Sequence, residues 1–268
     1  MLPFILIAFI LGLFLGGLGT KLVHRLPRRM LAEYRMGCQA ELGLPVDEPR
    51  EVSGLASFCP HCGHQLTWWE TLPLIGYLAA RGKCRHCEQS IGWRYPVLEL
   101  GAAAICATAI GWFGVTVPAF LAAAAGLALL WLAAIDLTHT LLPEPLLSAV
   151  AVLGLSAATL EYFVSPGVAI EGGLAGFLLL ALPGWLLSKL RGVDVLGGGD
   201  PLLMAAIGTF IGAAGVLYAT LAACVLGLLY AGLMALLGKK VAGQELPLGH
   251  WLVLGGFVVF TAQQTGWL

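Results

Sequence analysis

Long runs of apolar residues, separated by short polar stretches, dominate the hydrophobic pattern of this 268-residue chain. A transmembrane helix needs about 20 predominantly apolar residues to cross about 30 Å of hydrocarbon. The pattern predicts about eight such helices, at residues 2–19, 97–114, 117–135, 144–163, 168–190, 201–213, 216–237 and 248–267. We therefore expect an all-α polytopic membrane protein.

Composition supports this fold class, because 59% of the residues are hydrophobic and only 11% are charged. A soluble domain usually has about 25% charged residues. Of the 14 Lys and Arg residues, ten lie between Lys21 and Arg94, and the others are Lys189, Arg191, Lys239 and Lys240. When the eight spans alternate across a bilayer, every one of these falls on the same side or at its membrane edge. Because cytoplasmic loops are rich in Lys and Arg, this side is predicted to be the cytoplasm, with both termini facing outward.

The only long polar segment lies between the first two predicted spans. It suggests a division into a first transmembrane helix (1–20), a cytoplasmic loop (21–95) and a seven-helix membrane core (96–268). The loop contains two C-x-x-C pairs separated by 21 residues, Cys59 with Cys62 and Cys84 with Cys87. This spacing is typical of a four-thiolate zinc site, in which each pair forms a tight turn and four sulfurs complete a tetrahedron.

Two alternatives remain for this cysteine motif. The four thiols can form two disulfides, although structural disulfides are rare in the reducing cytoplasm that the basic loop predicts. Neighbouring histidines, His61, His64 and His86, are reserve metal ligands. With four cysteine ligands the site has no open position, which indicates a structural rather than a catalytic zinc.

Two aspartates are placed at the membrane edge by the predicted spans. Asp136 ends the third span, and Asp200 opens the sixth, directly after Gly197-Gly198-Gly199. An ionisable group within or at the edge of the bilayer is costly and marks a functional site by default. Two nearby carboxyl groups can share one proton, so that one accepts a proton from water while the other donates to a carbonyl oxygen. This is the chemistry of aspartic peptide hydrolysis. A helix N-cap is the alternative for Asp200.

Other residues near the same edge are candidate substrate contacts. Glu144 follows Pro143 at the start of a span, where helix capping and a role as a third acid are the alternatives. Glu99 lies near the cytoplasmic end of the second span, where snorkelling to the membrane surface and pairing with Arg94 are the alternatives. Gly197 and Gly199 are expected to allow close approach of another backbone. His250 begins the last span and has no evident partner in the sequence.

Several other functions are disfavoured by missing patterns. The chain has no H-E-x-x-H, G-x-S-x-G or Walker A motif, and no basic, aromatic-rich groove suggests nucleic acid. An ion-coupled transporter is a rival interpretation, because intramembrane acids and glycine breaks also mark ion paths. Against it, both acids lie at one face and no inverted repeat is evident. A catalytically idle assembly factor with the same fold is a further alternative.

Taken together, the motifs resemble those of the bacterial prepilin peptidases, or type IV leader peptidases, which are G-x-G-D membrane aspartyl proteases. Residues 197–200 fit G-x-G-D, Trp93-Arg94-Tyr95-Pro96 leads into the second span, and Ile135-Asp136 is followed by Leu142-Pro143. The resemblance covers nearly the whole chain and includes both cysteine pairs. It implies that Asp136 and Asp200 are catalytic and that Cys59, Cys62, Cys84 and Cys87 bind zinc.

The resemblance also implies a substrate and a second activity. Such enzymes remove the basic leader of prepilins or pseudopilins at the cytoplasmic face of the inner membrane, and many then methylate the new N-terminus with S-adenosylmethionine. The sequence departs from the family at Gly16-Gly17-Leu18-Gly19-Thr20, at Leu202, at Glu144 and at Pro247-Leu248-Gly249-His250, which replaces a P-F-G-P-like turn. These departures bear on methylation and on the exact substrate, and none of them removes either acid. The sequence gives no indication of oligomeric state.

Overall fold

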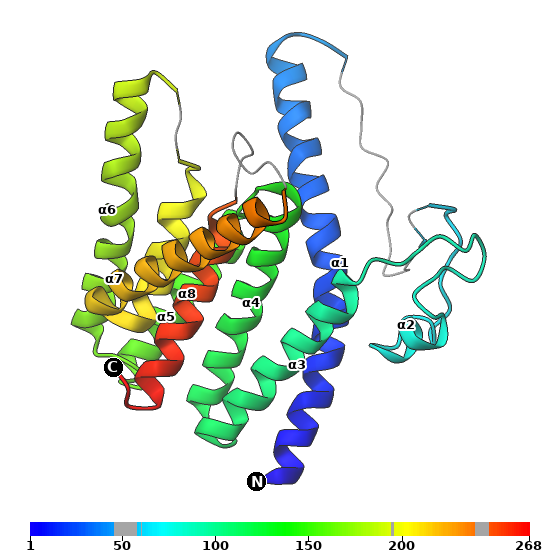
Figure 1. The fold of residues 1–268 in the computed structure, drawn as a ribbon, viewed down its shortest axis with the longest axis horizontal. Coiled ribbons are helices and arrows are strands. Elements are labelled where there is room, and N and C mark those ends of the chain that lie inside the picture. The colour runs from blue at the N-terminus through cyan, green and yellow to red at the C-terminus, as the bar shows by residue number, and fades with distance from the viewer. Residues whose placement is uncertain (46–57, 60, 194–195, 239–246) are drawn as a thin grey trace. The chain divides into compact units, whose positions relative to one another are not determined.

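A computed structural model describes residues 1–45, 58–59, 61–193, 196–238 and 247–268. Lys239 and Lys240, whose charges supported the predicted membrane topology, lie outside the described residues. The described residues form eight α-helices and no β-strand longer than an isolated bridge (Figure 1). The helices are α1 (Leu2–Glu41), α2 (Ile75–Ala79), α3 (Arg94–Phe113), α4 (Val117–His139), α5 (Glu144–Thr159), α6 (Pro166–Arg191), α7 (Gly199–Leu236) and α8 (Gly249–Gln264). The all-α prediction is confirmed.

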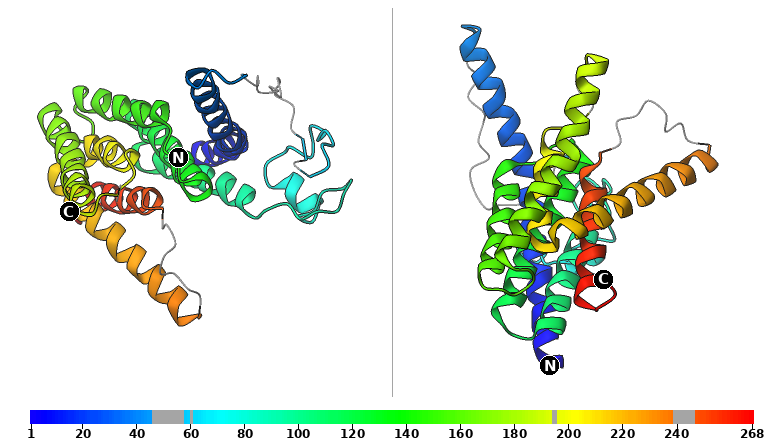
Figure 2. Two further views of the ribbon diagram at one scale, coloured as in Figure 1. Left: turned by 90° about the horizontal axis from the view of Figure 1, so that it is seen from above. Right: turned by 90° about the vertical axis from the view of Figure 1, so that its left-hand side faces the viewer.

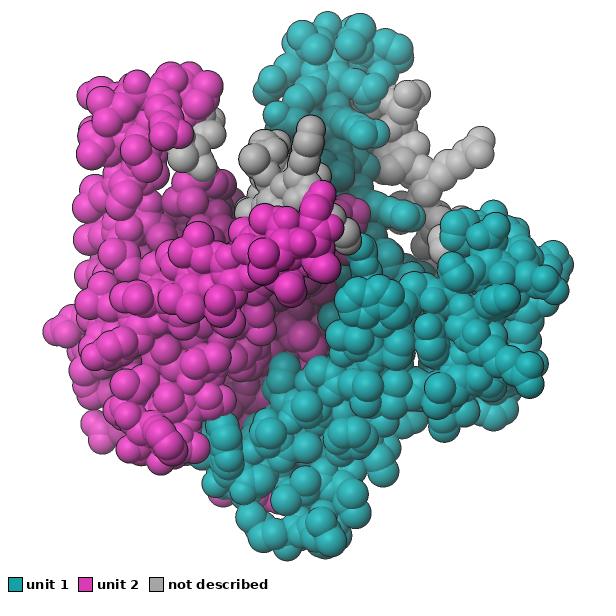
Figure 3. All heavy atoms as spheres, in the orientation of Figure 1, with its two compact units in different colours: residues 1–114 teal, residues 115–268 magenta. Residues whose placement is uncertain are grey.

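The chain divides into two compact units, Met1–Gly114 and Val115–Leu268, which Figure 3 shows in different colours. Unit 1 contains α1 to α3 and the cysteine motif, whereas unit 2 contains α4 to α8 and both candidate aspartates. The cysteine motif and the two candidate aspartates therefore belong to different units.

Unit 1 is built on the close packing of α1 against α3. A Cβ atom on Gly12 would lie 2.6 Å from the Cα of Ala103, and one on Gly16 would lie 2.6 Å from the Cα of Glu99. Small residues at such crossings let two membrane helices approach closely, so that van der Waals contact holds them together.

The first helix extends far beyond the end that the hydrophobic pattern predicted. It continues through the basic residues after position 20 and ends at Glu41. Val23 and Pro27, one helical turn apart, are both buried, and the ring of His24 stacks on that of Tyr95 at 5.4 Å. The extension is thus amphipathic, with a buried stripe along one side and the exposed Arg29–Glu33 ion pair on its polar surface. Hydropathy averaged along the sequence is low for such a segment, because its polar residues outweigh the buried stripe.

In unit 2 the first half of α7 forms the centre of the core. Helices α5, α6 and α8 all pack against α7, and Leu203, Met204 and Val216 are completely buried. Glycines make these contacts close: a Cβ on Gly172 of α6 would meet the carbonyl oxygen of Gly208 on α7, and one on Gly176 would meet that of Met204. The α6 glycines thus serve close helix packing at these two positions.

Helix α7 contains a sharp kink at Gly212, where φ is +69° and ψ is 175°. A left-handed φ is accessible to glycine at little cost, and sharp kinks commonly occur at such residues. Figure 2 shows the second half of α7, drawn in orange, leaving the direction of the first half. The two predicted spans at 201–213 and 216–237 therefore lie on one continuous helix with a break between them.

Five helices among the described residues are long and apolar enough, by length and composition, to cross a membrane: α1, α3, α4, α6 and α7. Helix α5 is a shorter apolar helix. Each of the eight predicted spans lies on a helix, with two of them on α7, and the count of eight membrane crossings stays a prediction.

Candidate active site and metal centre

Asp136 is held in the last turn of α4, in unit 2. Its residue is only 4% exposed, and the preceding Ile135 and Leu132 are fully buried, so the end of the helix is fixed by core packing. The helix ends just beyond, where Thr140 adopts a left-handed conformation and its N–H donates to the carbonyl oxygen of Asp136 at 2.9 Å. Burial of an acid in an otherwise apolar helix end is the costly arrangement that marks a functional group.

Asp200 lies in the first turn of α7 and is 8% exposed. The N-cap of this helix is Gly198, so the alternative that Asp200 serves as the N-cap is wrong. Its backbone N–H donates to the carbonyl oxygen of Gly197 at 3.2 Å, which closes the glycine turn before the helix. The carboxyl group benefits there from the positive end of the helix dipole.

The structure brings the two aspartates together within unit 2. The two carboxyl groups lie close enough for the charge of Asp136 to be felt at Asp200, although the residues come from different helices. The turns that carry them also touch: a Cβ on Gly199 would lie 2.7 Å from the Cβ of Leu142, which follows α4. Glycine at position 199 therefore permits close contact between the two turns that carry the acids.

The other two glycines of the turn have different surroundings. A Cβ on Gly197 would lie 3.3 Å from Oδ2 of Asp200, so a side chain there would crowd the carboxylate, and Gly197 itself is exposed. Gly198 has no neighbour within 4 Å of such an atom, and its φ of −60° is open to any residue. Of the three glycines, Gly199 is thus the one required by packing, and Gly197 borders the carboxylate.

The sequence missed one residue of this site, His250. Its backbone N–H donates to Oδ2 of Asp136 at 2.9 Å, and its ring Nδ1 lies 3.4 Å from the same oxygen. Gly249 allows the contact, because a Cβ there would lie 3.0 Å from the Asp136 carboxyl carbon. Asp136 is therefore the partner of His250 that the sequence did not reveal. A contact across 114 positions leaves no signal in one sequence beyond a polar residue at the start of an apolar helix.

The two candidate substrate-binding glutamates have distinct surroundings. Glu144 is exposed in the first turn of α5, where Pro143 is the N-cap and no side chain caps the helix, so the capping alternative is wrong. Glu99, in unit 1, accepts a hydrogen bond at 2.8 Å from the N–H of Leu74, a residue with φ of +57°. Glu99 thus stabilises the strained turn before α2, a role that its position in the sequence did not suggest.

The four cysteines of unit 1 gather into one cluster. Their sulfur atoms all lie within 4.8 Å of one another. The two pairs fold alike, with backbone N–H groups donating to backbone carbonyl oxygens in the same pattern. In the first pair, Cys59 donates to His64 and Gly63 donates to Cys59. In the second pair, Cys84 donates to Gln89 and Glu88 donates to Cys84. Gly63 and Glu88 each have a positive φ, as a tight turn of this kind requires. Two matching knuckles therefore face each other.

The cluster fits a zinc ion. Tetrahedral zinc with four sulfurs at about 2.3 Å places those sulfurs about 3.8 Å apart, and Sγ of Cys59 lies 3.8 Å from Sγ of Cys87. Each of the seven cysteines is described and is a free thiol, and a 3.8 Å separation is far longer than a disulfide bond. The backbone N–H of Cys62 lowers the pKa of the Cys59 thiol to about 6, which favours the metal-binding thiolate. The rings of His64 and His86 stack beside the cluster at 4.9 Å.

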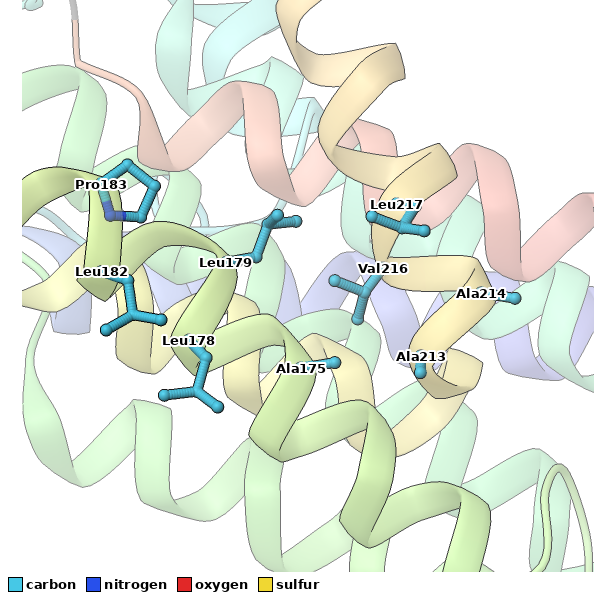
Figure 4. Close-up of a pocket in the computed structure, with 9 residues that line it drawn as sticks. All are labelled: Ala175, Leu178, Leu179, Leu182, Pro183, Ala213, Ala214, Val216 and Leu217. Carbon is cyan, nitrogen blue, oxygen red and sulfur yellow. The ribbon is translucent and has the colours of Figure 1, made fainter.

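An apolar groove between α6 and α7 is a separate feature of unit 2 (Figure 4). It is open on one side and lined only by apolar residues: Ala175, Leu178, Leu179, Leu182, Pro183, Ala213, Ala214, Val216 and Leu217. It contains neither aspartate and no group able to transfer a proton.

Comparison with known proteins agrees with this architecture. Residues 10–113 match the model of the bacterial peptidase A24 N-terminal domain, and residues 123–232 match that of the type IV leader peptidase family. A prepilin leader peptidase/N-methyltransferase of Burkholderia pseudomallei is 37% identical over 256 residues, covering 93% of this chain and 82% of the relative. One of Pseudomonas aeruginosa is 33% identical, covering 96% and 90%. No solved structure matches the chain. With both family models matched in order and relatives above 30% identity along nearly its whole length, the chain belongs to the type IV leader peptidase family.

Proposed function

We propose that this protein is an aspartic endopeptidase of the bacterial inner membrane that removes the basic leader of type IV prepilins or pseudopilins. The observation that carries this proposal is the pair of buried aspartates, Asp136 and Asp200, brought within electrostatic reach at the ends of α4 and α7. The relatives of the chain are named as leader peptidases, which supplies the substrate class.

The chemistry follows from the sharing of one proton between two carboxyl groups. Two like charges at close range cannot both form cheaply, so one acid is ionised and the other keeps its proton. The ionised carboxylate takes a proton from water as the water oxygen attacks the scissile carbonyl carbon, and the protonated acid donates to the carbonyl oxygen. The surrounding apolar helices strengthen these interactions by lowering the local dielectric.

The substrate is proposed to enter from two directions. A prepilin presents an apolar helix to the bilayer and a basic leader to the cytoplasm. By the positive-inside rule, the zinc module of this protein is proposed to lie on the same cytoplasmic side, with both termini of the protein facing outward. Glu144, which is exposed, and Glu99 are proposed to attract the leader's Lys and Arg, and Gly197 and Gly199 to border the bound backbone. Such attraction at exposed or partly exposed sites is modest and screened by salt.

Zinc in this proposal is structural. Cys59, Cys62, Cys84 and Cys87 would hold it, and the four thiolates leave no position for water. The ion would supply folding free energy to a polar module that has few buried apolar side chains of its own.

N-methylation of the new N-terminus is the second proposed activity. The methyl group would pass from the sulfonium of S-adenosylmethionine to the free amine, which loses a proton. The names of the relatives support it, since each includes N-methyltransferase.

The test uses purified full-length protein and a synthetic prepilin in detergent or lipid. Asp136→Asn and Asp200→Asn should each lower leader cleavage by about a hundredfold or more while leaving the protein folded, because each removes a proton site and keeps the shape. Cleavage by either variant at the parent rate would refute the paired-acid mechanism. Labelled S-adenosylmethionine and a pre-cleaved pilin measure methyl transfer separately, and the absence of label would refute the second activity.

A further inference from the structure

The Asp136 carboxylate is held by its neighbours at one oxygen only. Oδ2 accepts the backbone N–H of His250 at 2.9 Å and lies 3.4 Å from the ring Nδ1 of the same residue. Both residues are buried, at 4% and 8% exposure. Among the described residues, no hydrogen bond reaches Oδ1 of Asp136 or the carboxyl group of Asp200.

This asymmetry distinguishes the two aspartates. A backbone N–H can only donate, so Oδ2 of Asp136 must act as an acceptor, and a donor at a carboxylate favours its ionised form. Asp200 has no comparable donor in the described part of the chain. The ring contact adds to this effect when Nδ1 carries the proton, but at 3.4 Å it is weaker than the N–H contact at 2.9 Å.

We propose that His250 is a positioning residue that holds Asp136 as the ionised member of the pair, with Oδ1 as the oxygen that takes the proton from water. Asp200 then keeps the shared proton and donates it to the substrate carbonyl. This inference rests on the proposed peptidase function and deepens it, because it assigns a different role to each acid.

The proton movements balance over one cycle. Attack of water forms the new carbon–oxygen bond, one water proton moves to Oδ1 of Asp136, and the Asp200 proton moves to the carbonyl oxygen. Collapse of the tetrahedral intermediate breaks the carbon–nitrogen bond, Asp136 returns its proton to the leaving amine, and Asp200 regains a proton from the hydroxyl group of the intermediate. Both acids then stand as they began.

The position of His250 allows the two contacts to be removed separately. It lies in the first turn of α8, which begins at Gly249, and its N–H is bonded to Asp136 rather than to the helix. Proline in a first turn costs no helical hydrogen bond, so His250→Pro removes both the N–H and the ring. His250→Ala removes the ring alone, and His250→Asn keeps an amide nitrogen near the place of Nδ1.

The experiment measures kcat and KM for prepilin cleavage by the full-length protein and its three His250 variants, with thermal unfolding as a check on folding. We expect kcat to fall about tenfold or more in His250→Pro, the size of one lost hydrogen bond to a charged group. A smaller fall of about threefold is expected in His250→Ala, and His250→Asn should stay within about twofold of the parent. KM should stay nearly constant throughout, because His250 acts through Asp136.

Two results would overturn the assignment. One is a folded His250→Pro protein with the parent kcat, and the other is a rise in KM at constant kcat, which would make His250 a substrate contact. If His250→Pro does not fold, the Ala and Asn variants decide: equal activity in both overturns the proposal, and loss in Ala with recovery in Asn supports it. Activity retained by Asp136→Asn and Asp200→Asn would instead refute the proposed function itself.

Discussion

Substitution of Gly199 by alanine tests whether the spacing of the two aspartates depends on a close contact between the turns that carry them. The added Cβ would lie 2.7 Å from the Cβ of Leu142 and 3.0 Å from its Cδ1. Ordinary contact between such atoms begins at 3.4 Å, so the turns must separate by about 0.7 Å. A Cβ is fixed to the backbone and cannot rotate away, so the backbone beside Asp200 has to move.

The size of the effect follows from this displacement. Overpacking of a tight contact typically costs about 1–3 kcal/mol, and a misplacement of about 1 Å in a catalytic group can lower a rate about a hundredfold. We therefore expect Gly199→Ala to lower kcat for prepilin cleavage by about ten- to a hundredfold. The melting temperature should fall by about 2–12 °C, since about 1 kcal/mol shifts a protein of this size by about 2–4 °C.

The assay compares kcat and melting temperature with two matched variants. Gly198→Ala adds the same atom one position earlier, where nothing lies within 4 Å, and should keep the parent activity. Leu142→Gly removes the opposing Cβ, so the double variant with Gly199→Ala should recover activity relative to Gly199→Ala alone. A Gly199→Ala protein as active as the parent would refute the reasoning, as would equal damage from Gly198→Ala.

Two further predictions concern the metal and the helix packing. Cys84→Ser should release one zinc per chain, as measured by elemental analysis, and make residues 59–87 sensitive to limited protease digestion. The control Cys224→Ser, on an exposed part of α7, should retain the metal. A full zinc content in Cys84→Ser would contradict the proposed metal site. Gly172→Ala should lower the melting temperature, because the added Cβ would meet the backbone of Gly208. In the control Gly232→Ala the added Cβ has no neighbour within 4 Å. This control should leave the melting temperature unchanged or raise it slightly, because alanine has a higher helix propensity than glycine. Equal melting temperatures for the two alanine variants would count against close packing of α6 on α7.

Features that depend on residues close together in the chain could be predicted from the sequence. Runs of apolar residues predicted where helices lie, because a membrane span must satisfy its own backbone hydrogen bonds and bury an apolar surface over a known length. The spacing of Cys59, Cys62, Cys84 and Cys87 predicted a metal cluster, because two residues between thiols are the length of one tight turn. Asp136 and Asp200 were conspicuous as acids at the ends of apolar segments. In each case the pattern is carried by residues within one short stretch of the chain, from a few to about 25 residues long.

Features that depend on how helices pack were decided only by the tertiary structure. The extension of α1 to Glu41 depends on a stripe of buried residues along one side of the helix. The basic residues of this segment keep its average hydropathy low, so the stripe was not apparent in the sequence. The continuity of α7 across Gly212 required a backbone conformation that the composition of two apolar runs does not specify. The contact between His250 and Asp136 joins residues 114 positions apart, and it forms because α4 and α8 cross where Gly249 leaves room for a carboxylate. Crossings of this kind are set by the shapes of whole helix surfaces, so a single sequence shows the residues at the site but not which of them meet.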